Sequence, residues 1–442
     1  MPGDRLRDQA NDGAFCAMLA IQAIRQVRLG VTGNESQWRP AGATLIRSLK
    51  HPSEVELLRQ VYGPRIVIVG VSDLPDVREG LLRKALLPVG ATRETVAAAA
   101  GEAAALVRRD EKDEGRRLGQ RVSKTYELCD VYLPTGGSEL PESARRLVAL
   151  LFGKPFVTPS RDEMGVWHAY AAKFRSSAAG RQVGAVITDQ DGELLATGCN
   201  DVPIPFGGQN WDGDCDDHRD FALGHDANDK HKFAVAEEML GELAKKGWLA
   251  SHLVAREPAE LAELALFKGD APPLKDTRIA DLLEFGRIMH AEMAALMTAA
   301  RRGTPVRGAD LYTTTYPCHE CMRLIIGAGI ARVVYVDPYP KSLVPELYGG
   351  HLGKSRDHPS KVEISPFVGL SPRLVPRVFA QVGARKRDSR GVYAKWIGSQ
   401  ASYAGAEDRY LDTTLVHEAA VGELLEQHLK RLGEIDDASA SD

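Results

Sequence analysis

Three residues that can ligate a metal, His290, Cys318 and Cys321, constrain this 442-residue chain more than any other feature. His290 and Glu292 lie on a predicted helix over 288–302, whereas Cys318 and Cys321 stand at a predicted strand-to-helix turn. The 28 positions from His290 to Cys318 allow the first helix to end and one strand to cross before the second helix begins. Two cysteines three residues apart at the N-terminus of a helix can both face one ion. The helix dipole at that end also favours their thiolate forms.

This donor set favours zinc with an open coordination position. One imidazole and two thiolates suit Zn²⁺, and three protein ligands leave a fourth position for water, as in catalytic zinc sites. Glu292 is two residues from His290, so we expect it to hydrogen-bond that water and not to ligate the ion. The expected cofactor is therefore Zn²⁺, held by His290, Cys318 and Cys321, with Glu292 as the catalytic acid–base residue.

Charge and composition exclude several other classes of protein. The chain has 56 Lys and Arg against 60 Asp and Glu, a net charge of -4, which argues against a protein that coats duplex nucleic acid. We find no apolar run of membrane-spanning length and no signal-peptide core, so we expect a cytoplasmic protein without a membrane partner. The six cysteines are too sparse for a disulfide scaffold.

Hydrophobic patterning predicts an α/β domain over 1–155. A helix begins at Pro52, short apolar strands cover 65–71 and 129–134, and helices lie between and after them, which is the alternation of a parallel sheet. The pattern resembles part of a nucleoside-phosphate-kinase fold. The phosphate-binding loop G-x-x-x-x-G-K-[ST] is absent from the sequence, so we expect a scaffold or interaction domain here and not a kinase.

A second domain is predicted over 160–400. Its first helix is followed by two apolar runs, 183–188 and 193–198, on either side of an Asp-Gly turn, which predicts a β-hairpin. A long, partly helical insertion occupies 201–285, and the core elements resume with strands over 310–314 and 332–336 around a helix over 318–328. The last part, 401–442, predicts an amphipathic helix and a disordered acidic tail.

The ordered pair H-x-E and P-C-x-x-C is the signature of zinc nucleobase deaminases. Further segments resemble deoxycytidylate deaminases, namely 176–177, 181–186, 197–203 and 328–336. With its N-terminal domain, the whole chain is similar to bacterial antiphage deoxycytidylate deaminases, except that the phosphate-binding loop is missing. The resemblance implies a three-layer α/β/α cytidine-deaminase-like domain preceded by a truncated P-loop-kinase-like α/β domain.

The same resemblance implies a function. It is the zinc-dependent hydrolysis of dCMP, dCTP or both to the uracil nucleotide and ammonia, which in the antiphage group depletes deoxycytidine nucleotides during infection. Such proteins are homo-oligomers, often hexamers, and the antiphage group is held inactive by a small RNA. Two alternatives remain at this point: an RNA or polynucleotide cytidine or adenosine deaminase, and a non-catalytic zinc protein.

Four residues are candidate substrate contacts. Asn200 could bond the sugar or serve as a turn residue, and Arg181 could meet a phosphate or a subunit interface. Tyr316 could stack on the base or pack in the core, and Arg219 could contact a triphosphate or form a surface ion pair. A second zinc site is also conceivable in the insertion, with the candidate ligands Cys215, His218, His225 and His231.

Overall fold

The computed structural model divides into two compact units, which we describe separately. The first contains Met1–Trp167, Val334–Ser342 and Ile364–Asp442, and the second contains His168–Val333 and Leu343–Glu363. The described residues are 2–37, 42–73, 75–87, 92–111, 113, 116–135, 139–214, 216–269, 272–275, 277–280, 282, 284–339, 342–353, 360–380, 390–393, 395–401, 403 and 411–439. The domain boundaries expected from the sequence stay a prediction.

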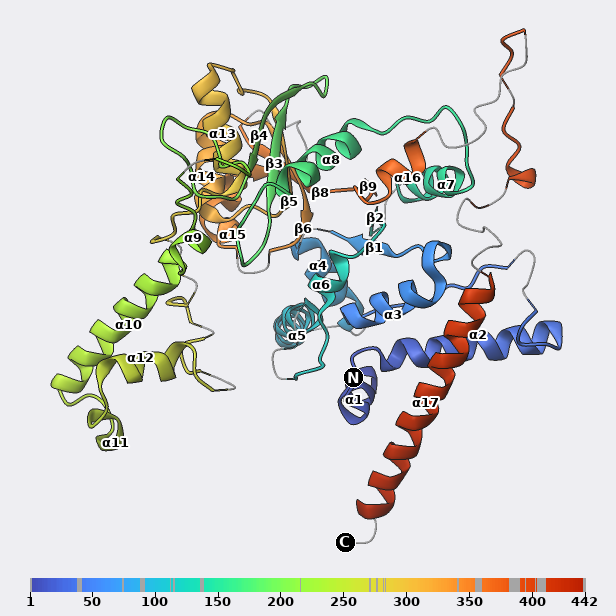
Figure 1. Cartoon of the computed structure of the whole chain (residues 1–442), viewed down its shortest axis with the longest axis horizontal. Coiled ribbons are helices and arrows are strands. Elements are labelled where there is room, and N and C mark those ends of the chain that lie inside the picture. Colours follow the sequence, from blue (N-terminus) through green and yellow to red (C-terminus); the bar gives the residue numbers. More distant parts are fainter. Residues whose placement is uncertain are drawn as a thin grey trace. The chain divides into compact units, whose positions relative to one another are not determined.

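Helices from both ends of the chain build one core of the first unit. Helices α1 (Pro2–Ala10), α2 (Phe15–Thr32) and α3 (Pro52–Tyr62) pack with α17 (Leu411–Ser439), as Figure 1 shows. Their apolar faces bury Phe15, Met18, Ile21, Leu58, Val421 and Leu425 among others. The expectation of a disordered acidic tail was wrong, because α17 continues through that segment to Ser439.

A small sheet forms the other part of the first unit. Strands β1 (Val69–Ser72) and β2 (Val131–Pro134) pair in parallel, and β9 (Gly369–Leu370) adds antiparallel to β2. The parallel pair agrees with the strand–helix alternation that the sequence predicts. The remaining helices of this unit are η1 (Gly63–Arg65), α4 (Pro75–Leu86), α5 (Arg93–Glu111), α6 (Val122–Tyr126), α7 (Glu139–Leu151), α16 (Val375–Phe379) and η3 (Gly398–Gln400).

A six-stranded sheet underlies the candidate site. Its order is β4-β3-β5-β6-β8-β7, with the strands β3 (Gly184–Thr188), β4 (Leu194–Cys199), β5 (Asp310–Thr315), β6 (Arg332–Asp337), β7 (Leu352–Gly353) and β8 (Val362–Pro366). Strand β3 is antiparallel to both β4 and β5. The predicted hairpin is therefore confirmed, and Gly192 at its turn has a φ of 94°, a conformation that favours glycine.

Two glycines bring helices onto opposite faces of this hairpin. A Cβ on Gly184 would lie 2.0 Å from the Ala169 carbonyl oxygen in α8 (Arg161–Lys173), so this helix packs directly on the backbone of β3. A Cβ on Gly198 would lie 2.4 Å from the Ala291 carbonyl oxygen in α13 (Ala291–Arg302). Gly198 pairs with Ala185, the neighbour of Gly184, so the two glycines face opposite sides of the sheet. Helices thus cover both faces.

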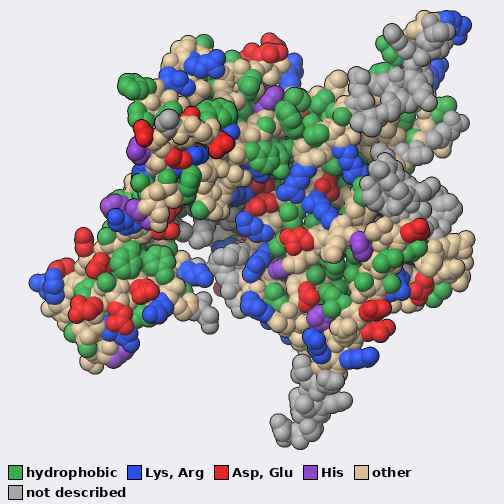
Figure 2. All heavy atoms as spheres, in the orientation of Figure 1, with side chains coloured by type: hydrophobic (Ala, Val, Ile, Leu, Met, Phe, Trp, Pro, Cys, Tyr) green, Lys and Arg blue, Asp and Glu red, His purple; other side chains and the backbone are tan. Residues whose placement is uncertain are grey.

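The predicted insertion is largely helical and carries its own small core. It contains α9 (Asp220–Leu223), α10 (Ala227–Lys245), α11 (Ser251–Val254) and α12 (Pro258–Leu266), where α10 and α12 bury Ala236, Ala262 and Leu266 between them. On the face drawn in Figure 2, acidic and basic side chains are interspersed over the insertion, around a patch of hydrophobic side chains. The second unit also contains α15 (Val344–Tyr348) and η2 (Gly349–His351).

Among the described residues, no single helix is long and apolar enough to cross a membrane. Helices α1 and α2 meet the length and composition criteria only as a pair, across a bend of 103°.

Candidate metal centre

The N-termini of two helices meet at the candidate site. His290 is the N-cap of α13, with φ -66° and ψ 155°, and Cys318 is the N-cap of α14 (His319–Ala328). The sequence placed His290 inside a helix beginning at residue 288, which was wrong. The segment before it is extended because the N–H of Met289 donates to the carbonyl of Asp201 at 3.0 Å, and the Asp201 N–H donates back to Met289 at 3.2 Å.

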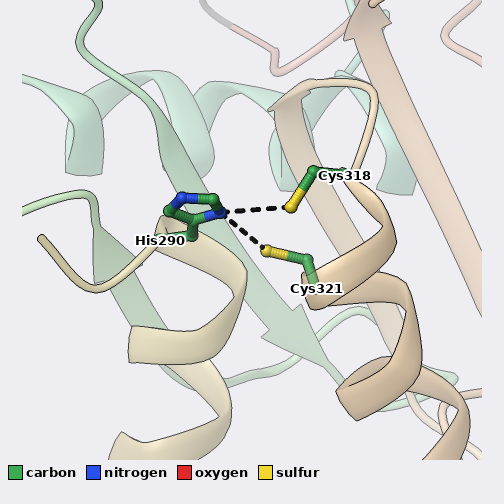
Figure 3. A group of neighbouring side chains, drawn as sticks. All are labelled: His290, Cys318 and Cys321. Carbon is green, nitrogen blue, oxygen red and sulfur yellow. Dashed lines mark hydrogen bonds between the residues drawn. The ribbon is translucent and has the colours of Figure 1, made fainter. Parts of the chain in front are cut away.

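Three donor atoms converge between these helices. The Nδ1 atom of His290 lies 3.2 Å from Sγ of Cys318 and 3.4 Å from Sγ of Cys321, and the three donors lie within 4.8 Å of one another. Figure 3 shows the imidazole pointing at both sulfurs from the neighbouring helix. Both cysteines are buried. One nitrogen and two sulfurs at this separation fit Zn²⁺ with an open fourth position.

The pKa values of the two thiols are shifted in opposite directions. The hydrogen bond from Cys321, followed by the one from His290, lowers the pKa of Cys318, whereas the hydrogen bond with Cys318 and burial raise the pKa of Cys321. The hydrogen bond with Cys318 raises the pKa of His290. Zinc binding requires both cysteines as thiolates, and the lowered pKa of Cys318 favours that form.

Glu292 points into the same space from the first turn of α13. Its side chain is 4% exposed, and its Oε2 accepts a hydrogen bond from the Cys321 thiol at 3.3 Å. Its Oε1 accepts one from the hydroxyl of Thr313 on β5, also at 3.3 Å. Burial raises the pKa of Glu292. A carboxyl group in this position can take up and release a proton beside the metal ligands.

The sequence did not single out Thr313. It lies in a run of three threonines on a strand whose six residues are all buried. Hydroxyl groups on a fully buried strand need partners, and that requirement is the signal that could have identified this residue.

Arg219 lies between two carboxylates. Its guanidinium donates to both oxygens of Asp217, with a shortest distance of 2.6 Å, and its Nη1 lies 3.8 Å from Oδ2 of Asp201. Asp201 is 1% exposed, and its other oxygen accepts from the hydroxyl of Ser177 at 3.0 Å. The hydrogen bonds from Arg219 lower the pKa of Asp217 to about 2. The guanidinium of Arg219 is therefore fixed by Asp217 within the insertion of the second unit.

The other candidate substrate contacts have structural partners. The amide of Asn200 donates to the carbonyl of Arg181 at 2.7 Å, and its oxygen accepts from the N–H of Val183 at 2.6 Å, so it ties the end of β4 to the loop before β3. Tyr316 is half-buried, and burial raises its pKa to about 12. Substrate contact by Asn200, Arg181 and Tyr316 stays a prediction.

A hollow of about 300 Å³ opens beside Asp201. The residues that line it include Ser177, Val202 and Phe221. Ile288, which also lines it, lies two residues before His290 in the sequence. The ring of Phe221 also lies against the guanidinium of Arg219, at 4.9 Å. Asp220, His225 and Asp226 also line the hollow, so it combines apolar walls with several ionisable side chains.

The second zinc site expected in the insertion falls partly outside the described residues, because Cys215 is not among them. Where the chain is described, the group of His290, Cys318 and Cys321 is the one cluster of three such ligand atoms. His225 faces the Leu223 carbonyl, and His231 lies against the ring of Phe285.

The part of the chain that contains this site is similar to known proteins. Residues 160–337 match the family model described as the cytidine and deoxycytidylate deaminase zinc-binding region, and this range contains all three donors and Glu292. This part of the chain is similar to that zinc-binding region. The six-stranded sheet with helices on both faces agrees with the three-layer α/β/α arrangement that the sequence implied.

Individual relatives match part of the chain. ComE operon protein 2 of Bacillus subtilis is 30% identical over 30% of this chain and 61% of its own length. The deoxycytidylate deaminase of Enterobacteria phage T2 is 28% identical over 39% of this chain and 78% of its own length. A solved dCMP deaminase from the cyanophage S-TIM5, in complex with dCMP and dUMP, has 17% identity and a TM-score of 0.27, covering 48% of this chain and 100% of that one.

Proposed function

We propose that this chain is a zinc-dependent deaminase that hydrolyses dCMP, dCTP or both to the uracil nucleotide and ammonia. The observation that carries the proposal is the buried carboxylate of Glu292, which contacts Cys321 at the point where His290, Cys318 and Cys321 converge. The similarity to the phage T2 deoxycytidylate deaminase supports the choice of nucleotide.

The roles of the residues follow from their positions. His290, Cys318 and Cys321 would hold zinc, which supplies a Lewis acid that makes water nucleophilic at neutral pH. The oxygen of water adds to C4 of the cytosine, and Glu292 takes the proton that the water releases and delivers it to N3. Glu292 then carries the second proton to the 4-amino group, the C4–N bond breaks, and ammonia leaves. The burial of Glu292, which raises its pKa, suits a group that must hold a proton between these transfers.

The first experiment replaces Glu292 by glutamine in the zinc-loaded protein. Glu292→Gln should retain zinc and lose turnover of dCMP by about three orders of magnitude or more, because the glutamine amide cannot take up and release the proton. The matched control is Glu320→Gln, which alters a more exposed carboxylate between the two cysteines that pairs with Arg323. Wild-type turnover in Glu292→Gln would refute the assignment.

The substrate class is decided with the wild-type protein. It is incubated with dCMP, dCTP, CMP, cytidine and a cytosine-containing oligonucleotide, and the uracil product of each is measured. Conversion of the free deoxynucleotides supports the proposal. Conversion of the oligonucleotide alone would favour a polynucleotide deaminase, and no conversion at full zinc content would favour a non-catalytic zinc protein.

The proposal has a wider part that rests on the resemblance to antiphage deoxycytidylate deaminases. In this wider proposal, the protein is a cytoplasmic homo-oligomer that depletes deoxycytidine nucleotides during infection, and a small RNA controls its activity. A kinase-like N-terminal domain without a phosphate loop belongs to the same prediction. Phage plating on cells that express wild-type protein or Glu292→Gln tests the defence role, since only the active protein should reduce plaque number.

A further inference from the structure

We propose that Thr313 is a positioning residue for Glu292, and this inference rests on the proposed function. Its hydroxyl holds Oε1 of the carboxylate, so that Oε2 faces the reacting groups. The hydrogen bond joins strand β5 to helix α13, and its two residues are 21 positions apart in the sequence.

The position of Thr313 is rigid. Its side chain is 0% exposed, and its backbone is fixed by pairing with Ala185 on β3. A β-branched side chain on a buried strand has little freedom at χ1, so the hydroxyl keeps one direction. That hydroxyl lies 3.3 Å from Oε1 of Glu292 and 3.1 Å from the Thr315 carbonyl oxygen. Its single proton can therefore serve either acceptor.

Metal binding makes this contact more important. Besides the backbone N–H of Glu292 itself, the carboxylate has two side-chain donors, the Cys321 thiol at Oε2 and the Thr313 hydroxyl at Oε1. A cysteine that ligates zinc has lost its proton and no longer donates. The Thr313 hydroxyl is unaffected, so of the two side chains it alone can still donate to the carboxylate while Oε2 becomes available for the proton transfers.

The adjacent residue supplies a matched control. Thr314 is also buried, but its hydroxyl accepts from the backbone N–H of Gly184 at 3.2 Å and contacts no residue of the metal centre. Substituting either threonine by valine removes one hydroxyl from the same strand and leaves a side chain of similar shape. Only the substitution at 313 removes a partner of Glu292.

The experiment compares zinc-loaded wild type with Thr313→Val, Thr313→Ser and Thr314→Val. Thr313→Val should bind zinc fully and lose about 10-fold or more in kcat, the size of effect typical of outer-shell partners at metal sites, with KM for dCMP within about twofold. Thr313→Ser, which retains the hydroxyl, should recover most of kcat. Thr314→Val should stay close to wild type in kcat.

A second measurement does not depend on turnover. Crystal structures of zinc-loaded wild type and Thr313→Val should differ in the orientation of the Glu292 carboxylate. An unchanged orientation, a wild-type kcat in Thr313→Val, or an equal loss in Thr313→Ser would overturn the inference. If wild type deaminates none of the nucleotides, the proposed function fails, and the crystallographic comparison still decides whether Thr313 positions Glu292.

Discussion

Arg219 illustrates how a single side chain connects the insertion to the candidate site. Its charge is shared between Asp217, which binds it through two oxygens, and the buried Asp201, which lies 3.8 Å away. A polyanionic ligand at the margin of the neighbouring hollow would compete with Asp217, since the phosphate groups of a nucleotide carry more charge than one carboxylate.

At the residue scale we therefore predict a selective effect of Arg219→Gln. KM for dCTP should rise by about tenfold while kcat changes little, and KM for dCMP should rise less, because a triphosphate offers the guanidinium more negative charge than a monophosphate does. Steady-state kinetics with both nucleotides measure this. The control is Arg256→Gln, an exposed arginine paired with Glu260 on the insertion. Equal changes for the two nucleotides would contradict a phosphate contact.

At the scale of elements, the close packing of α13 on β4 sets the position of the Glu292 carboxylate. A Cβ on Gly198 would lie 2.4 Å from both the Ala291 carbonyl oxygen and the Ala295 nitrogen. Gly198→Ala must therefore push α13 away from the sheet, and with it His290 and Glu292. We expect a loss of about 1–3 kcal/mol in stability together with weaker zinc binding.

Urea unfolding and zinc titration of the same protein measure both effects. Gly327→Ala in α14 is the control, because a Cβ there meets no atom within 4 Å and should stabilise the helix by up to about 1 kcal/mol. A Gly198→Ala protein with unchanged zinc affinity would show that the approach of α13 to β4 does not set the metal geometry.

A second contact between elements predicts a pH dependence of stability. Glu163 at the start of α8 is 1% exposed, and it accepts two hydrogen bonds from Arg146 on α7 and one from the Leu370 N–H on β9. Burial opposes its ionisation, but these bonds and one from the Ser160 N–H outweigh burial and lower the pKa of Glu163. Its stabilising contribution is therefore present above the unfolded pKa of about 4.3 and is lost as pH falls through the lower folded value.

Glu163→Gln should thus destabilise the protein by about 2 kcal/mol at pH 7, a moderate value because Arg146 is 35% exposed on its side chain. The difference from wild type should shrink below about pH 4. Urea unfolding at both pH values measures it, and a difference that is the same at both would exclude ionisation of Glu163 as the cause.

At the scale of the whole molecule, the first unit is built from both ends of the chain. Arg28 on α2 donates to both oxygens of Glu418 on α17, at 2.8 and 2.6 Å, and the two residues are 390 positions apart. Both side chains are buried. The same helices also bury Val421 and Leu425 in the core that contains Phe15. The C-terminal helix is therefore part of the N-terminal core.

Glu418→Gln should cost about 3–5 kcal/mol, because it leaves the buried charge of Arg28 without its partner. Replacing both residues, with Arg28→Met and Glu418→Leu, should recover most of that loss, since neither buried charge then remains. Thermal unfolding of the full chain followed by circular dichroism measures the three proteins. A double variant no more stable than Glu418→Gln would show that the pair contributes through its specific geometry.

The sequence by itself determined the chemistry of the site. The identities and spacing of His290, Cys318 and Cys321 predicted a three-donor cluster, because two helix starts separated by one strand can meet in few ways. Glu292 was predicted to hydrogen-bond the metal-bound water and not to ligate the ion, because it lies only two residues from His290. The β-hairpin could also be predicted from the sequence, because two apolar runs on either side of an Asp-Gly turn pair with each other.

Only the tertiary structure decided which distant groups complete the site. The hydroxyl of Thr313 reaches Glu292 because β5 lies beneath α13, and Arg219 meets Asp201 because the insertion folds back beside β4. Helix α13 begins one residue after His290 because Asp201 pairs with the residue before it. Such contacts depend on which elements pack together, and packing is a long-range outcome of burying apolar surface that no local pattern of residues encodes.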